Sequence, residues 1–356
     1  MADQENSQGE CNGATVGILT GGGDCPGLNA AIRAVARRGM MYGWRVIGFR
    51  NGWAGVVERN CIDLGWRSVS GILQQGGTML GTSRTDPRKS EASFEKVRSV
   101  FEELGLEALV AIGGDDTLSV AHALAKEGKP VIGLPKTMDN DVQGTDYCIG
   151  FDSAVTRVME ALDYLHTTAA SHHRAMVVEV MGRHAGWVAA IGGLAGGADF
   201  IIVPETTISL SSLIAHLERR QAAGRSFSII VVAEGAIVDG LELIEPDLDA
   251  RDEFGHQLLG TKQIGQRLAE AIERESGMES RVTVLGHVQR GGPPSVFDRV
   301  LATRLGVSAA DMVRDKQWGF MPALQGSQIV RVSLDEATAG NRKLDLDLYE
   351  VAEIFF

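Results

Sequence analysis

The sequence has few cysteines, no long apolar run and no excess of positive charge. Its four cysteines, Cys11, Cys25, Cys61 and Cys148, lack the spacing of a metal site or a redox pair. Isolated thiols in a chain of this size indicate a reducing cytoplasm. No apolar run approaches the length of a membrane span. Residues 1–13 are polar and acidic, so we expect a disordered tail rather than a signal peptide.

The formal net charge of −12 argues against nucleic-acid binding through a broad cationic surface. Phosphate groups can still bind where arginines converge locally. The length of 356 residues favours two domains, and 44% hydrophobic with 22% charged residues is typical of a globular protein. The 44 glycines fit a fold with many tight turns between strands and helices. We expect neither a membrane nor a nucleic-acid partner.

One stretch, residues 109–141, predicts a strand, a helix and a second strand. Residues 109–112 and 130–134 are short apolar runs, and residues 117–127 have helical spacing. The loops GGDD at 113–116 and KTMDND at 136–141 should therefore emerge at the carboxyl ends of parallel strands. Ligands of open α/β sheets bind at that edge.

The same alternation continues on both sides of this stretch. The glycine run at 20–27 joins a predicted strand at 15–19 to a predicted helix at 28–38. Such a loop lets backbone N–H groups approach an anion, although it lacks the motif of a P-loop or a dinucleotide site. The pattern predicts a doubly wound α/β fold. Further predicted strands are 44–49, 176–180, 200–203, 228–233 and 281–285; further predicted helices are 93–104, 211–223, 262–275 and 295–312.

Charged residues flank the strands of the second half, and we expect their loops to share one edge of a sheet. The guanidinium fork of arginine suits phosphate, and a lone carboxylate accepts hydrogen bonds from sugar hydroxyls. This half therefore resembles a site for a phosphorylated polyol. The residues are Arg174, Arg183, Glu234, Arg281, His287 and Arg290.

The acidic loops of the first half supply the parts that phosphoryl transfer needs. These are a metal, positive groups around the moving phosphoryl and a carboxylate that takes the proton of the acceptor. Asp115 suits Mg²⁺, Lys136 suits charge stabilisation, and either Asp139 or Asp141 suits the base. Asn140 and Asp141 also favour turns without any catalytic role. Spacing does not choose between the two aspartates.

Taken together, these motifs resemble the phosphofructokinase family. The resemblance runs in order from about Val16 to Arg304 and includes GGDCPGLN at 22–29, GGD at 113–115, KTMDND at 136–141, VMGR at 180–183 and LGHVQRGG at 285–292. It implies two doubly wound, Rossmann-like three-layer domains with the active site in the cleft between them. By resemblance, residues 14–150 and 289–339 form the phosphoryl-donor domain, and residues 151–288 and 340–356 form the sugar-phosphate domain.

The resemblance also implies roles for individual residues. Asp139 becomes the base that deprotonates the 1-hydroxyl of fructose 6-phosphate, and Asp115 the Mg²⁺ residue. Arg174 and Arg281 match arginines that reach the sugar phosphate of a neighbouring subunit, which implies a homodimer or homotetramer. Gly22, Arg84 and Lys136 would contact the donor, and Thr137, Asp139, Met181, Gly182, Arg183, Glu234, His287 and Arg290 would hold the sugar phosphate.

Asp116 indicates which donor is used. Members of the family that use ATP typically have glycine at this position, and many have glycine at Lys136. A carboxylate at Asp116 would charge the space that the inner phosphate of ATP needs. Two like charges about 4 Å apart repel by roughly 4 kcal/mol at an effective dielectric near 20. The HAGW string at 184–187 resembles the subgroup that holds both donor types. We therefore expect pyrophosphate as the donor.

The predicted reaction is the reversible, Mg²⁺-dependent transfer of a phosphoryl group from pyrophosphate to fructose 6-phosphate. It gives fructose 1,6-bisphosphate and phosphate and serves glycolysis and gluconeogenesis. Three alternatives stay open: an ATP-dependent 6-phosphofructokinase, a pyrophosphate enzyme that prefers sedoheptulose 7-phosphate, and a silent sugar-phosphate sensor. The sensor is disfavoured because Asp115, Asp139 and Arg183 are all present.

Overall fold

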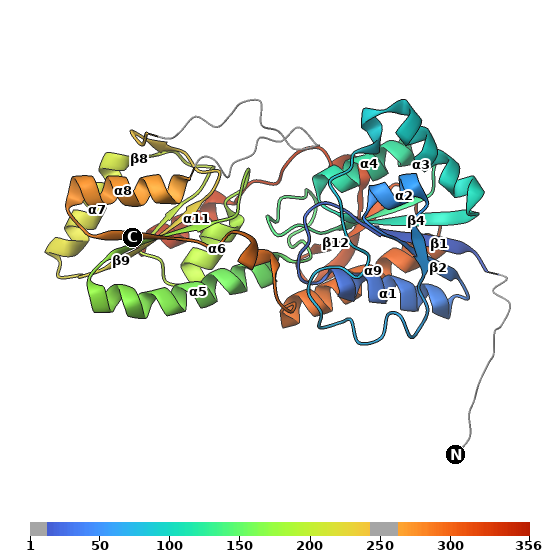
Figure 1. The fold of residues 1–356 in the computed structure, drawn as a ribbon, viewed down its shortest axis with the longest axis horizontal. Coiled ribbons are helices and arrows are strands. Elements are labelled where there is room, and N and C mark those ends of the chain that lie inside the picture. Colours follow the sequence, from blue (N-terminus) through green and yellow to red (C-terminus); the bar gives the residue numbers. More distant parts are fainter. Residues whose placement is uncertain (1–12, 243–262) are drawn as a thin grey trace, which may run out of the picture.

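The computed structural model describes residues 13–242 and 263–356. Predictions for residues 1–12 and for the first residue of the helix at 262–275 lie outside the described residues. Figure 1 shows two lobes side by side, each built around its own sheet. No helix in the described ranges is long and apolar enough to span a membrane.

The first lobe contains a seven-stranded sheet in the order β13-β12-β5-β4-β1-β2-β3. The strands from β12 to β2 pair in parallel, and the edge strands β13 and β3 are antiparallel. The core is divided into two clusters, one on each face of this sheet. The strands are β1 (Thr15–Thr20), β2 (Arg45–Phe49), β3 (Cys61–Asp63), β4 (Leu106–Gly113), β5 (Val131–Pro135), β12 (Phe320–Gln325) and β13 (Gln328–Ser333).

Helices cover both faces of this sheet, which gives the lobe three layers. One face is covered by α1 (Leu28–Met41) and α9 (Val296–Arg314). The other face is covered by α2 (Trp53–Glu58), α3 (Glu91–Glu103), α4 (Asp115–Lys126) and α10 (Leu334–Ala337). A short 3₁₀ helix, Pro87–Lys89, precedes α3.

The second lobe contains a parallel four-stranded sheet in the order β11-β6-β9-β7. Its core is one continuous cluster of buried apolar side chains. The strands are β6 (Ala175–Val180), β7 (Phe200–Ile202), β9 (Ser228–Ala233) and β11 (Ser280–Val284), with β8 (Ile208–Ser209) and β10 (Val238–Asp239) in a small separate sheet. The helices are α5 (Phe151–His172), α6 (Trp187–Ala195), α7 (Leu210–Ala222), α8 (Ile264–Ser276) and α11 (Leu346–Glu353), and a 3₁₀ helix spans Gly286–Arg290.

A buried carboxylate fixes the place where the chain crosses between the lobes. Asp298 of α9 accepts hydrogen bonds from the backbone N–H groups of Gly150 and Ser153, both at 2.8 Å, and from the Ser153 hydroxyl at 2.6 Å. These bonds satisfy donors at the start of α5 that have no partner inside the helix. The two helices that connect the lobes are therefore joined to each other.

The doubly wound α/β class predicted from the sequence is confirmed. Every predicted strand and helix is present, most with shifted ends, and β9 has the predicted bounds. The sequence interpretation missed β12, β13 and the helices α5 and α6, among others. α6 carries adjacent glycines, which are poor helix formers. A Cβ atom at Gly192 would lie 2.7 Å from Val158 of α5, so glycine lets the two helices pack closely. Close packing therefore overrides the local propensity.

Candidate active site

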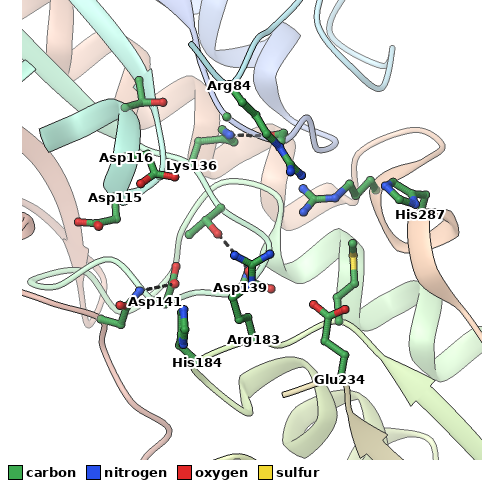
Figure 2. Close-up of a pocket in the computed structure, with 18 residues that line it drawn as sticks. Arg84, Asp115, Asp116, Lys136, Asp139, Asp141, Arg183, His184, Glu234 and His287 are labelled. Atoms are coloured by element: carbon green, nitrogen blue, oxygen red, sulfur yellow. Dashed lines mark hydrogen bonds between the residues drawn. The ribbon is translucent and has the colours of Figure 1, made fainter. Parts of the chain in front are cut away.

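Loops from both lobes line one cavity of about 510 Å³ (Figure 2). In the first sheet β1 lies beside β4, and the chain leaves these two strands toward opposite edges of the sheet. Ligands of open α/β sheets bind at such a switch point. The cavity is lined by Gly22, Gly23, Arg84, Gly114, Asp115, Asp116, Thr117, Lys136, Thr137, Asp139, Asp141, Met181, Arg183, His184, Glu234, His287, Arg290 and Asn341.

Lys136 lies beneath the glycine loop that follows β1. Its Nζ donates to the backbone oxygens of Gly21 at 2.9 Å and Gly23 at 2.6 Å, and the residue is 2% exposed. Burial lowers the pKa of this ammonium group below its usual value. Lys136 thus holds the glycine loop in place, and the residue lines the cavity. Its predicted contact with the donor stays a prediction.

Gly23 packs against the guanidinium of Arg290 at the cavity. A Cβ atom at this position would lie 2.3 Å from Nη1 of Arg290, closer than the 3.0 Å below which Cβ atoms make essentially no contacts. The same Nη1 donates to the backbone oxygen of Asp24 at 3.1 Å. Glycine at this position therefore leaves room for the guanidinium of Arg290 in the place that it occupies.

The first turn of α4 carries two carboxylates into the cavity. Asp115 and Asp116 are its first two residues, where the helix dipole favours negative charge. Thr117 follows, and its buried hydroxyl has no hydrogen-bond partner among the described residues. Figure 2 shows Asp115 and Asp116 on one side of the cavity, with Glu234 and His287 on the opposite side.

A tight turn after β5 presents Asp139. Asn140 adopts a left-handed conformation with φ of 54°, which asparagine tolerates better than most residues. Its side chain donates to the backbone oxygen of Asp146 at 3.0 Å and accepts from the backbone N–H of Cys148 at 2.8 Å. The turn interpretation of Asn140 is therefore confirmed, and this buried turn fixes the positions of Asp139 and Asp141.

The environment of Asp139 favours a protonated carboxyl. Burial is the main cause, and with the nearby Asp141 carboxylate it raises the pKa of Asp139 to about 7. Arg290 and Arg183 act in the opposite direction. Oδ1 of Asp139 is buried without a hydrogen-bond partner in the described part of the chain. A base with a pKa near neutral and an open acceptor oxygen is suited to take a proton from a bound hydroxyl.

The second lobe supplies the opposite wall of the cavity. Arg183 follows β6, Glu234 follows β9 and His287 lies in the 3₁₀ helix after β11. Burial raises the pKa of Glu234, although Arg183 counteracts it. Gly182 does not line the cavity. Its φ of 142° and the 2.8 Å between a Cβ atom there and the oxygen of Ala185 show that it shapes the turn before Arg183.

The expectation that Arg174 and Arg281 share this edge is wrong. They lie next to or within the amino ends of β6 and β11, so the parallel sheet places them at the edge opposite the cavity. Nε of Arg174 contacts Glu279 at 2.9 Å, and Nη2 of Arg281 contacts the same carboxylate at 2.5 Å. Their predicted contact with a neighbouring subunit stays a prediction.

Five residues of the cavity wall were not predicted as site residues: Gly23, Gly114, Thr117, His184 and Asn341. Gly23, Gly114 and His184 lie within motifs that the sequence analysis used, and Thr117 directly follows one, so their position in the chain was a usable signal. Asn341 lies 200 residues beyond Asp141, yet its Nδ2 donates to Oδ2 of that carboxylate at 2.7 Å. No local pattern marks Asn341.

The family model described as Phosphofructokinase matches residues 15–313. The chain belongs to the phosphofructokinase family. A family member from Amycolatopsis mediterranei, named pyrophosphate–fructose 6-phosphate 1-phosphotransferase, is 53% identical over 96% of this chain and 99% of its own length. A member from Corynebacterium efficiens, named ATP-dependent 6-phosphofructokinase, is 45% identical over 96% of this chain and 98% of its own.

Solved structures of phosphofructokinases share the fold. The crystal structure of Pichia pastoris phosphofructokinase in the T-state matches with a TM-score of 0.79 and 35% identity. The match covers 96% of this chain and 36% of the Pichia chain, so this protein corresponds to about a third of that longer one.

Proposed function

We propose that the protein is a pyrophosphate-dependent phosphofructokinase that phosphorylates the 1-hydroxyl of fructose 6-phosphate. The observation that carries this proposal is Asp139, a buried carboxylate with a pKa of about 7 at the centre of a two-lobed cavity. One wall carries the carboxylates of α4, and the other carries Arg183 and Glu234. This arrangement supports a base placed between a donor site and a sugar-phosphate site.

Pyrophosphate as the donor is supported by Asp116 and by the relatives. Asp116 lines the cavity at the start of α4, where its charge opposes the inner phosphates of ATP. Relatives at 51–53% identity, and one at 45%, are named pyrophosphate–fructose 6-phosphate 1-phosphotransferase, whereas other relatives at 44–45% are named ATP-dependent 6-phosphofructokinase. ATP is therefore the second candidate donor.

In the forward reaction Asp139 takes the proton of the 1-hydroxyl as its oxygen attacks a phosphorus of pyrophosphate. The bond between that phosphorus and the bridging oxygen breaks, and orthophosphate leaves. Arg84 and Lys136 offset the charge of the donor, and Arg183 and Arg290 hold the sugar phosphate. Because pyrophosphate is a lower-energy phosphoryl donor than ATP, we propose that the reaction is readily reversible and operates in glycolysis and gluconeogenesis.

Mg²⁺ fits the donor wall. No group of three or more histidine, cysteine, aspartate or glutamate side chains positioned for a metal occurs among residues 13–242 and 263–356. Mg²⁺ commonly uses only one or two protein carboxylates and completes its shell with water and substrate phosphates. Asp115 is the residue that we propose for this role. When bound, Mg²⁺ would offset the charge of the transferred phosphoryl group.

The remaining assignments follow from the family. We propose a cytoplasmic homodimer or homotetramer in which Arg174 and Arg281 complete the sugar-phosphate site of a neighbouring subunit. The proposed domain limits are those given by the resemblance, residues 14–150 and 289–339 against 151–288 and 340–356. The separate hydrophobic clusters of the two sheets support this division.

A comparison of donors tests the function directly. With Mg²⁺ and fructose 6-phosphate, we expect pyrophosphate to support formation of fructose 1,6-bisphosphate at least a hundredfold faster than ATP, as measured by kcat/KM. Phosphate and fructose 1,6-bisphosphate should drive the reverse reaction at a comparable rate. Activity with ATP alone would contradict the donor assignment, and a negligible reverse rate would contradict reversibility.

The pH dependence follows from the raised pKa of Asp139. The forward reaction needs the ionised carboxylate, so forward kcat/KM should rise as the pH increases through about 7. The reverse reaction needs the protonated acid and should fall over the same range. Asp141→Asn removes a charge that raises this pKa, so it should move both limbs to lower pH. If the pH profiles of Asp141→Asn do not move, the pH dependence arises from titration of the substrate phosphates and not from Asp139.

A further inference from the structure

The C-terminal segment at residues 341–344 passes between the lobes and contacts both of them. The backbone N–H of Arg342 donates to the oxygen of Asp141 at 2.7 Å, and Nη1 of Arg342 donates to the oxygen of Asp146 at 3.0 Å. On the other lobe, the guanidinium of Arg342 lies 4.2 Å from the centroid of the Trp187 ring. These contacts dock the segment without any help from the side chain of Asn341.

The side chain of Asn341 has a separate partner. Its Nδ2 donates to Oδ2 of Asp141 at 2.7 Å, and both residues line the cavity that holds Asp139. An amide donor stabilises a carboxylate in its ionised form and fixes its direction. Other contacts already dock this segment. The bond between Nδ2 of Asn341 and Oδ2 of Asp141 therefore serves to orient the carboxylate and is not needed to hold the segment in place.

We propose that Asn341 is a positioning residue for proton transfer, and that it holds the side chain of Asp141 in a fixed direction beside Asp139. This proposal rests on Asp139 as the base of the proposed function. Asp141 is the charged neighbour that raises the pKa of Asp139 most. A fixed Asp141 therefore keeps the affinity of Asp139 for the proton constant through the reaction.

Other charged groups also act on this pair. Those that influence the pKa of Asp139 are Asp141, Arg183, Glu234 and Arg290, and the cavity also holds Asp115, Asp116, Lys136, His184 and His287. The hydrogen bond to Oδ2 of Asp141 at 2.7 Å comes from Nδ2 of Asn341. The first variant, Asn341→Asp, therefore changes that nitrogen to an oxygen.

Asn341→Asp keeps the shape of the side chain and replaces the donor by a carboxyl group. At low pH the two carboxyls can share one proton, so a donor is retained. At higher pH this proton is lost and the carboxylates repel each other. The added charge also raises the pKa of Asp139 further. We expect a bell-shaped profile of kcat against pH, with a new alkaline limb and an acid limb moved upward by about half a unit or more.

Asn341→Ala and Lys343→Ala complete the test. Asn341→Ala should lower kcat about tenfold in both directions and change each KM less than twofold. Nζ of Lys343 donates to the backbone oxygen of His184 at 2.5 Å, so Lys343→Ala loosens the same segment but leaves Asp141 untouched. We expect less than a twofold effect on kcat from this control, and thermal unfolding near the parent temperature for all three variants.

Two results would overturn the proposal. One is an Asn341→Asp profile parallel to that of the parent, and the other is an equal loss of kcat in Lys343→Ala. The assay uses whichever of pyrophosphate and ATP the parent protein accepts better. A wrong donor assignment is therefore visible in the parent protein, as activity with ATP instead of pyrophosphate. A wrong role for Asn341 is visible only in the ratio of the variant's kcat to that of the parent.

Discussion

Replacing Asp139 by asparagine lowers the forward kcat by about 10³-fold, because general-base catalysis contributes on the order of 10²–10⁴-fold. The amide has nearly the same shape but cannot take the proton of the 1-hydroxyl. Forward and reverse rates should fall together, because the same group acts as base in one direction and as acid in the other. The measurement is kcat in both directions with saturating substrates.

The stability of the same variant separates chemistry from misfolding. The pKa of Asp139 rises from 3.8 to about 7 on folding, so the folded protein disfavours the ionised carboxylate. Its stability therefore decreases as the pH rises from about 4 to 7, and the decrease is complete above 7. Asparagine removes this cost, which is at most about 4 kcal/mol at 1.36 kcal/mol per pKa unit. We expect a higher Tm than the parent at pH 8, and about the same Tm at pH 4. If Asp139→Asn keeps more than a tenth of the parent's forward kcat, another residue is the base.

Replacing Asp116 by glycine opens the donor site to ATP. The carboxylate lines the cavity in the first turn of α4, and its removal eliminates a repulsion of up to roughly 4 kcal/mol against a phosphate about 4 Å away. We expect kcat/KM for ATP to increase about a hundredfold, while fructose 6-phosphate keeps its KM within threefold. The measurement is the ratio of kcat/KM values for ATP and pyrophosphate.

Asp116→Asn separates the charge of this side chain from its size. Asparagine removes the charge and keeps the volume, so a gain in ATP use by both variants would identify repulsion as the barrier. A gain by the glycine variant alone would identify steric exclusion. If neither variant gains ATP activity, Asp116 does not determine the donor, and the fold and the sugar site remain as described.

Much of the site followed from the sequence because its residues lie in short loops directly after predicted strands. Parallel strands bring such loops to one edge, so Asp115, Asp139, Arg183 and Glu234 converge on one cavity. The same rule shows why Arg174 and Arg281 do not line this cavity. An arginine at the start of a parallel strand lies at the edge of the sheet opposite to the one where the strand ends.

Lys136 shows where side-chain chemistry alone is insufficient. Its positive charge next to acidic loops suited charge stabilisation, and the family resemblance implied a contact with the donor, which stays a prediction. In the structure its Nζ reaches two backbone oxygens of the glycine loop, and the residue is 2% exposed. The direction of a long, flexible side chain depends on which acceptors the fold places near it, and the sequence does not specify these acceptors.

The sequence by itself determined the α/β class, the family and the loops that carry the chemistry. These depend on local features: apolar runs of strand length, glycines that allow tight turns, and charged residues at fixed spacing after each strand. Only the tertiary structure decided the protonation of Asp139 and the place of Asn341. A pKa depends on burial and on charges from distant segments, and the bond between Asn341 and Asp141 joins residues 200 positions apart. Such contacts exist only after the C-terminal segment has packed between the lobes.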